Sequence, residues 1–205
     1  MKKVFIATSR KIGEKCYNWA KSNMPSGYVI SDEIESADIL ISVMYDKLLD
    51  KHTVDTKKCF NFHPGVLPEY RGAGAYSWVL LNGERKTGVT LHEINEGIDT
   101  GDIIEIREFL ISSNDTAHSL FRRAEDLLYK MFIDWFDDIL FGRYESVPQK
   151  KNEGSIYLRN DLNKAKNITN IMRAFHFPGK ESAYYLNDSN EKIYLKFKGG
   201  YYERC

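Results

Sequence analysis

The feature that most constrains this chain is the stretch of residues 59–72, which reads CFNFHPGVLPEYRG. Its first residues are mostly apolar and predict a strand, whereas Pro64, Gly65 and Pro68 exclude regular structure from the residues that follow. A loop rich in proline and glycine holds a fixed shape at low entropic cost. Because α/β proteins place their chemistry on such loops at the carboxyl ends of strands, this stretch is the first candidate for a functional site.

Two polar residues alternate with two aromatic residues in the predicted strand. Asn61 and His63 are separated by one residue, and so are Phe60 and Phe62. On a strand this spacing puts both polar side chains on one face and both aromatic rings on the other. We therefore expect an amide and an imidazole to point together into the space above the sheet.

A second candidate region lies further along the chain. Val89 and Leu91 predict a strand, residues 95–101 a loop, and residues 103–106 the next strand. Asp99 lies in that loop between two glycines. A carboxylate held near an imidazole raises its basicity and fixes its orientation, so we expect Asp99 to act on a histidine.

Together these two regions resemble the folate-dependent formyltransferases, a family that includes glycinamide ribonucleotide, methionyl-tRNA and sugar-nucleotide N-formyltransferases. The family signature is Asn-x-His-Pro at a strand end, then Leu-Pro and Arg-Gly, and later Ile-Asp-x-Gly. It stands here at residues 61–64, 67–68, 71–72 and 98–101. The resemblance, which is good over residues 36–112, implies a Rossmann-like α/β domain with a mostly parallel sheet flanked by helices.

The resemblance also implies a catalytic role for Asn61, His63 and Asp99. Formyl transfer from 10-formyltetrahydrofolate to an amine makes the formyl oxygen negative and requires the amine to lose a proton. An amide N–H of Asn61 would stabilise that oxyanion. His63 would donate to it when charged, or shuttle protons, and Asp99 would set the state of His63. The alternative is an asparagine and a histidine satisfied within a loop, beside an unrelated aspartate.

For the formyl donor, the resemblance implies a pterin pocket at the end of a buried strand over residues 37–43. The residues assigned to it are Met44, Tyr45, Leu48, Asn95, Gly97 and Ile98. We expect the two segments to flank the pterin because both leave neighbouring strand ends. The alternative is that Tyr45 and Leu48 only pack a short helix on the sheet, since pocket walls and cores use the same residue types.

The residues assigned to the acceptor substrate are Arg71, Gly72, Tyr76 and Arg173. A large ring such as that of Tyr76 offers stacking area and a polar handle, although it could equally be a core aromatic. Arg173 belongs to the phrase at residues 172–179, which resembles the segment that follows the catalytic domain in sugar-nucleotide N-formyltransferases.

We predict a catalytic domain over residues 1–149 and an extension over residues 150–205. Fewer than about sixty residues without disulfides or metal rarely fold alone, so the extension should pack on the catalytic domain or on a second subunit of a homodimer. Its pattern predicts a short helix over residues 167–175 and a β-hairpin over residues 183–186 and 192–197. The best helix in the chain covers residues 115–140, with Asn114 or Asp115 as its cap.

Composition excludes several classes of protein. The charges of the 29 basic and 29 acidic residues cancel, so the chain as a whole has no electrostatic attraction for nucleic acid or for a membrane. Three scattered cysteines indicate a reducing compartment, and we expect a cytoplasmic protein with no metal site at ligand spacing. Residues 9–13 lack the glycine fingerprint of a dinucleotide site.

Three readings of the substrate remain. We favour a sugar-nucleotide acceptor, a 3-amino or 4-amino sugar linked to dTDP or UDP, because only about 25 residues follow Gly179 and these are too few for the tRNA-binding barrel of methionyl-tRNA enzymes. A glycinamide ribonucleotide enzyme should carry a glycine-rich loop after its first strand. A folate-binding protein without activity is least expected, because all three catalytic residue types are present.

Overall fold

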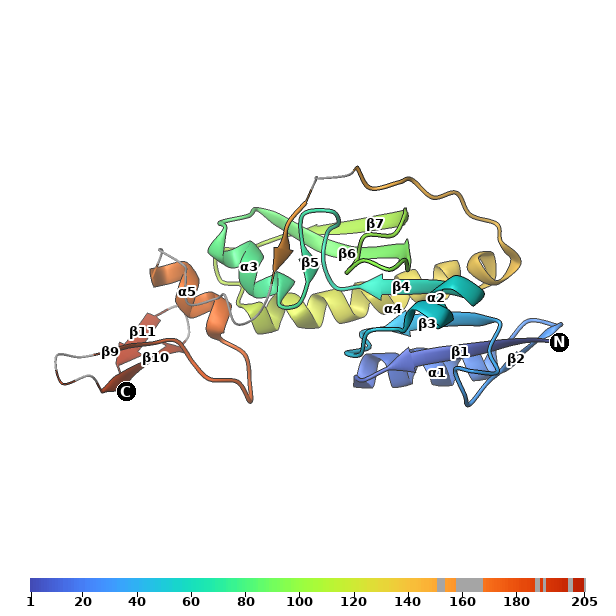
Figure 1. Cartoon of the computed structure of the whole chain (residues 1–205). Helices are drawn as coiled ribbons and strands as arrows, with labels where there is room; N and C mark the ends of the chain where they lie inside the picture. The colour runs from blue at the N-terminus through green and yellow to red at the C-terminus, as the bar shows by residue number, and fades with distance from the viewer. Residues whose placement is uncertain (151–153, 158–167, 187–188, 190, 199–200, 205) are drawn as a thin grey trace. The chain divides into compact units, whose positions relative to one another are not determined.

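The computed structural model describes residues 1–150, 154–157, 168–186, 189, 191–198 and 201–204 (Figure 1). The chain forms two compact units. The first contains residues 1–71, 88–107 and 124–156, and the second contains residues 72–87, 108–123 and 157–205.

The first unit is built on a six-stranded sheet, and the predicted α/β class with a mostly parallel sheet is confirmed. Strand β1 pairs in parallel with β2 and β3, β3 pairs in parallel with β4, and β4 pairs antiparallel with β6. The sheet order is β2 (Tyr28–Ile30), β1 (Lys2–Thr8), β3 (Ile39–Val43), β4 (Lys58–His63), β6 (Lys86–Glu93) and β7 (Ile103–Leu110). The remaining elements are α1 (Lys11–Ser22), α2 (Lys51–Thr56), α4 (Ala117–Phe141) and the paired strands β5 (Arg71–Gly72) and β8 (Ile156–Tyr157).

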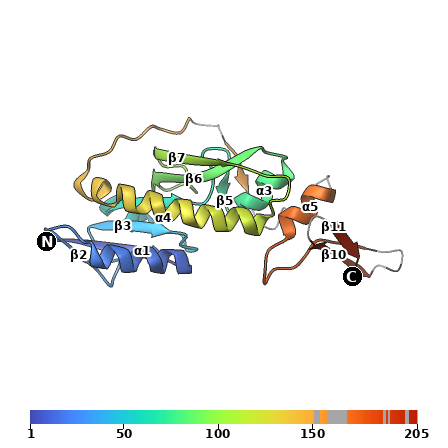
Figure 2. The ribbon, with the colours of Figure 1, turned by 180° about the vertical axis from the view of Figure 1, so that it is seen from behind.

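Aromatic packing places α1 and α4 on the same face of this sheet (Figure 2). Trp19 of α1 meets Phe132 of α4 edge-on at 6.1 Å between ring centroids, and Phe62 of β4 lies 5.3 Å from the same ring. Strand β3 is buried along its whole length. Because Phe62 faces α4, the alternating residues Asn61 and His63 point to the opposite face, as the spacing predicts.

The second unit contains α3 (Ala75–Leu81), α5 (Ile168–Phe175), β9 (Tyr184–Leu186), β10 (Lys192–Lys198) and β11 (Tyr201–Arg204). The predicted helix and hairpin are present, but the hairpin gains a third strand, because β11 pairs antiparallel with β10. Residues 151–153 and 158–167 of the predicted extension lie outside the described residues.

The compact units do not follow the predicted division at residue 149. Within the second unit, α5 packs against α3, and the Ser77 hydroxyl donates a 2.7 Å hydrogen bond to the Ala174 carbonyl. The Arg173 guanidinium donates to the carbonyls of Asp115 and Ser112 at 2.7 and 2.8 Å. The chain after residue 157 therefore shares its unit with two segments that precede residue 149.

The first turn of α4 corrects the predicted cap. The helix begins at Ala117, and Thr116 and Ser119 cap it reciprocally, each hydroxyl oxygen accepting from the other residue's backbone N–H at 3.2 and 2.9 Å. The carboxylate of Asp115 instead accepts from Arg123 at 2.8 Å. Among the described residues, no helix combines the length and the apolar character that crossing a membrane requires.

Candidate active site

The antiparallel pairing of β4 with β6 places four polar residues opposite one another on the sheet face away from α4. Asn61 lies opposite His92, and His63 lies opposite Thr90. Because Val89 and Leu91 alternate with Thr90 and His92, the apolar residues of β6 face the core, and its polar residues share a face with those of β4. Two neighbouring strands thus contribute polar groups to one small area.

The Asp99 loop reaches this area from the far end of β6. Since β6 runs antiparallel to β4, its last residue, Glu93, lies opposite Phe60, and the loop turns back over the sheet face. There the Asp99 carboxylate lies 3.3 Å from the Asn61 amide nitrogen and 3.4 Å from Nδ1 of His63. The structure therefore brings together the three residues assigned to catalysis.

The hydrogen bonds of His63 fix which of its nitrogens can exchange a proton. Nε2 lies 2.7 Å from the Tyr70 carbonyl, and a carbonyl oxygen only accepts, so Nε2 carries hydrogen and Nδ1 faces Asp99. Burial lowers the pKa of the His63 imidazole, outweighing the Asp99 carboxylate, which raises it. The expected gain in basicity is therefore wrong as a net effect, because the ring is 2% exposed.

His92 belongs to the same cluster, and the sequence reasoning missed it. Its ring is 1% exposed, and Nδ1 lies 2.6 Å from the Glu93 carbonyl, so Nε2 is left as an acceptor. The Asn61 amide donates to that Nε2 at 3.1 Å and to Asp99 at 3.3 Å, which occupies both of its hydrogens. The alternation of polar and apolar residues in β6 carried the signal for His92.

One hydroxyl group on β6 hydrogen-bonds the loop that follows β4. Thr90 Oγ1 accepts from the Leu67 N–H at 3.2 Å and donates to the Gly65 carbonyl at 2.7 Å. A side chain at Gly65 would not fit, since a Cβ there would lie 2.7 Å from Nε2 of His63. The predicted fixed shape of this loop thus has a specific cause.

The Asp99 loop is closed from within by Asn95. The Asn95 side-chain oxygen accepts from the Gly97 N–H at 3.0 Å and from the Thr100 hydroxyl at 2.6 Å. Asp99 has a left-handed backbone, with φ of 50°, which aspartate tolerates better than most residues. Ile98 is 40% exposed. The donor-binding roles of Asn95, Gly97 and Ile98 stay predictions.

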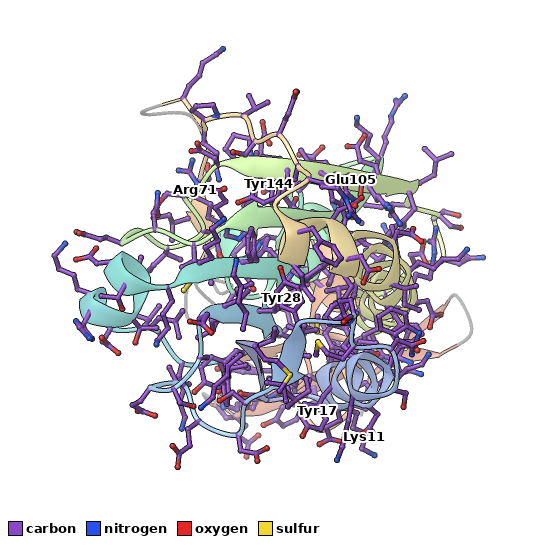
Figure 3. The ribbon with its side chains drawn as sticks, turned by 90° about the vertical axis from the view of Figure 1, so that its right-hand side faces the viewer. Lys11, Tyr17, Tyr28, Arg71, Glu105 and Tyr144 are labelled. Carbon is purple, nitrogen blue, oxygen red and sulfur yellow. The ribbon has the colours of Figure 1, made fainter. Side chains whose placement is uncertain are left out.

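Gln149, which the sequence reasoning also passed over, joins this loop to Arg71. Its amide nitrogen donates to the carbonyls of Asp99 and Gly101 at 3.0 and 2.7 Å, and its oxygen accepts from Arg71 Nε and Nη2 at 3.0 and 2.6 Å. Figure 3 shows Arg71 on the side of the sheet opposite Glu105, whose carboxylate accepts from Trp135 of α4. No local pattern marks Gln149, because its partners are 48 to 78 residues away in sequence.

In the segment after β3 that is assigned to the donor, some side chains are packed against the core and others are exposed. Tyr45 is half-buried and packs with Ile94 against a cluster that includes Leu40, whereas Leu48 is 83% exposed. Met44 has a left-handed backbone, with φ of 52°. The two donor segments do not leave neighbouring strand ends, because β6 is antiparallel and ends opposite Phe60. They are linked through Tyr45 and Ile94, which pack against the same cluster. Their contact with pterin stays a prediction.

Three of the residues assigned to the acceptor lie in the second unit. Tyr76 is 5% exposed, and its ring centroid lies 6.3 Å from that of Phe121, as in a packed core. Arg173 makes the two carbonyl contacts given above, and Gly72 has a φ of 84°. Their roles stay predictions. In the described part of the chain, no group of three histidine, cysteine, aspartate or glutamate side chains is placed to hold a metal ion.

Comparison with known proteins gives a consistent match. A family profile described as formyl transferase matches residues 11–135, which is more than half of the chain. A methionyl-tRNA formyltransferase of Thermodesulfovibrio yellowstonii is 34% identical over 168 residues, covering 76% of this chain and 53% of the relative. The chain thus spans about half the length of the curated relatives it matches.

Solved structures of similar fold cover the chain almost completely. A sugar N-formyltransferase of a Shewanella species has a TM-score of 0.84 at 20% identity, with 96% of this chain and 97% of that chain covered. WlaRD, described as a sugar 3N-formyl transferase in the presence of dTDP and 5-N-formyl-THF, has a TM-score of 0.78 at 25% identity, with 97% and 88% covered.

Proposed function

Because this chain belongs to the formyl transferase family, we propose that it moves a formyl group from 10-formyltetrahydrofolate to the amine of an amino-sugar nucleotide. The observation that carries the proposal is the cluster of Asn61, His63 and Asp99 on the face of β4 and β6. The Asp99 carboxylate lies within 3.4 Å of both the Asn61 amide and the His63 imidazole, so the three supply a donor for an oxyanion and a pair of groups that can share one proton.

In the proposed reaction, the acceptor nitrogen attacks the formyl carbon, and the carbonyl electrons move to the oxygen. The acceptor's excess proton goes to the Asp99–His63 pair, which holds no bridging proton when His63 is neutral and Asp99 is ionised. The bond from the formyl carbon to the folate nitrogen then breaks as the oxyanion collapses, and that nitrogen receives the proton. Nδ1 of His63 takes part, because Nε2 is engaged by the Tyr70 carbonyl.

In this scheme the oxyanion is stabilised by the Asn61 amide, which is already hydrogen-bonded to Asp99 before the reaction. The Asn61 amide donates to Asp99 across 3.3 Å, which is long for a bond to a carboxylate. When Asp99 takes up a proton it becomes a weaker acceptor, and the amide hydrogen can turn to the oxyanion. Proton uptake and oxyanion stabilisation would then occur together.

The choice of acceptor rests on two observations. The structural neighbours that cover nearly the whole chain include sugar N-formyltransferases, one of them described with dTDP. The net charge is zero, so the chain has no global attraction for a polyanion such as tRNA. Methionyl-tRNA is the second candidate, because the curated sequence relatives are methionyl-tRNA formyltransferases.

The direct test is formyl transfer from 10-formyltetrahydrofolate to a panel of acceptors. The panel contains dTDP- and UDP-linked sugars with a 3-amino or 4-amino group, glycinamide ribonucleotide and methionyl-tRNA, with His63→Ala as the inactive control. We expect turnover with an amino-sugar nucleotide. Transfer only to methionyl-tRNA or only to glycinamide ribonucleotide would overturn the choice of acceptor, and no transfer to any would overturn the activity.

We further propose a cytoplasmic homodimer. The support for a dimer is that large apolar side chains of the second unit are exposed, including Leu110 at 75% and Tyr184 at 36%. Sedimentation equilibrium at micromolar concentration measures the mass directly. A mass of 23.8 kDa, that of one chain, would contradict the dimer.

A further inference from the structure

Gln149 uses the whole hydrogen-bonding capacity of its amide in the first unit. Both N–H hydrogens are donated to backbone carbonyls, those of Asp99 and Gly101, and the oxygen accepts twice from Arg71. A carboxylate could not donate to the two carbonyls, and an ammonium could not accept from Arg71. The contacts therefore require an amide side chain, and glutamine supplies one of the right length.

The position of these bonds bears on the catalytic carboxylate. One accepted bond falls on the carbonyl of Asp99 itself, and the other falls two residues later. Both carbonyls follow the Asp99 Cα, so these bonds fix the peptide groups directly after it and thereby restrict the direction of its Cα–Cβ bond, and hence where its carboxylate points. Asn95 closes the same loop through Gly97 and Thr100, which lie on either side of Asp99, but it does not bond to the backbone carbonyl of Asp99.

The backbone conformation of Asp99 is one that requires such a restraint. Its φ of 50° lies in the left-handed region, which non-glycine residues leave readily when nothing holds them there. Gly101 is also confined, since a Cβ there would lie 1.8 Å from the Glu93 carbonyl oxygen. Two restraints, one from Gln149 and one from the packing of Gly101, therefore act on the backbone directly after the Cα of Asp99, the residue that approaches Asn61 and His63.

We propose that Gln149 is a positioning residue, which holds the backbone of Asp99 so that its carboxylate is directed at Asn61 and His63. This inference rests on the proposed function for its kinetic consequence. Its structural content is independent of the substrate, because the four contacts belong to the protein alone. Because the same side chain also orients the Arg71 guanidinium, the experiment has to separate the effect of Gln149 on Asp99 from its effect on Arg71.

The experiment compares Gln149→Met, Gln149→Glu and Gln149→Asn with wild type in the full chain. Methionine keeps the shape and removes every hydrogen bond, whereas glutamate keeps an oxygen for Arg71 but cannot donate to the Asp99 and Gly101 carbonyls. We expect kcat to fall at least tenfold in both variants while KM for the donor changes less than threefold. Glu145→Met, an exposed change on the same segment, is the matched control and should leave kcat unchanged.

Two outcomes would overturn the proposal. One is wild-type kcat in Gln149→Glu, which would assign the effect to Arg71. The other is equal loss from Gln149→Met in wild type and in an Asp99→Asn background, since a residue that acts through Asp99 has little left to remove once Asp99 is changed. Partial recovery of kcat in Gln149→Asn relative to Gln149→Met supports a role for the donated hydrogen bonds.

A readout without turnover separates this proposal from the proposed function. The ring nitrogen signals of His63 in ¹⁵N NMR report whether a carboxylate stands next to Nδ1. We expect Gln149→Met to shift the Nδ1 signal toward that of Asp99→Asn, while Glu145→Met leaves it in place. If wild type transfers no formyl group but the signal shifts, the function fails and the positioning role stands. An unshifted signal in Gln149→Met overturns the positioning role.

Discussion

Over residues 59–63 the two faces of β4 are both largely buried, yet they are chemically opposite. On one face Phe60 and Phe62 are at most 1% exposed, and Phe62 packs against Phe132. On the other face His63 is 2% exposed, beside Asn61 and His92. Burial of the apolar face stabilises the fold, whereas burial of the polar face costs free energy that only its hydrogen bonds offset. The comparison teaches that burial alone does not tell a core residue from a site residue.

The largest effect on stability should come from removing a side chain from the apolar face. We expect Phe62→Ala to lower the free energy of unfolding by about 3–5 kcal/mol, because a fully buried ring leaves a cavity. The folded fraction should keep its kcat, since the change lies on the face away from Asn61. Denaturant unfolding measures the first quantity, and Leu48→Ala, at an 83% exposed position, should change stability by less than about 0.5 kcal/mol.

Changes on the polar face should reverse that pattern. We expect His63→Ala and Asp99→Asn each to lower the rate about a hundredfold or more, as loss of a proton-transfer group does, with donor binding largely kept. Steady-state kinetics with the best acceptor and calorimetric donor titration measure the two effects. A His63→Ala rate within about threefold of wild type would end the catalytic assignment.

Thr90 offers a test between these extremes, because its hydroxyl supports the loop rather than the chemistry. Thr90→Val should cost about 1–3 kcal/mol of stability, since the Leu67 N–H and the Gly65 carbonyl lose their partner. Thr87→Val is the matched control, because the buried Thr87 hydroxyl has no hydrogen-bond partner among the described residues. The control should be neutral or stabilising; equal losses in both variants would contradict the role of Thr90.

The smallest effect concerns pH. Burial holds the pKa of His63 below its usual 6.5, so as pH falls below 6.5 the unfolded chain takes up a proton that the native imidazole refuses. Stability from this residue is therefore complete above pH 6.5 and declines as pH falls toward the native pKa. Urea unfolding of wild type and His63→Asn between pH 7.5 and about 5 should show a shallower decline in the variant; parallel curves would rule the effect out.

Much of the site could be predicted from the sequence because it obeys local rules. The two-residue alternation places Asn61 and His63 on one face, and the glycines around Asp99 mark a loop. The same alternation in β6 places His92 beside Thr90 on that face, so the sequence carries the information for His92 as well.

The remaining features depend on contacts that sequence spacing does not encode. Gln149 meets Asp99 50 residues away, and nothing adjacent to it predicts the contact. The net pKa of His63 required knowing that the ring is buried, which decides between two opposing effects. Strand β11 is only four residues long, and so short a segment carries too little periodicity to predict a strand without its partner β10.

The antiparallel register of β4 and β6 also limits how the length of this chain can change. Asn61 lies opposite His92 and His63 opposite Thr90, so one inserted or deleted residue in either strand would exchange polar for apolar side chains on the site face beyond that point. Such a change would remove the site and the core together. We therefore expect insertions and deletions to be tolerated only in the connections, and between these two strands only beyond Tyr70, because residues 65–70 hold Thr90 and His63.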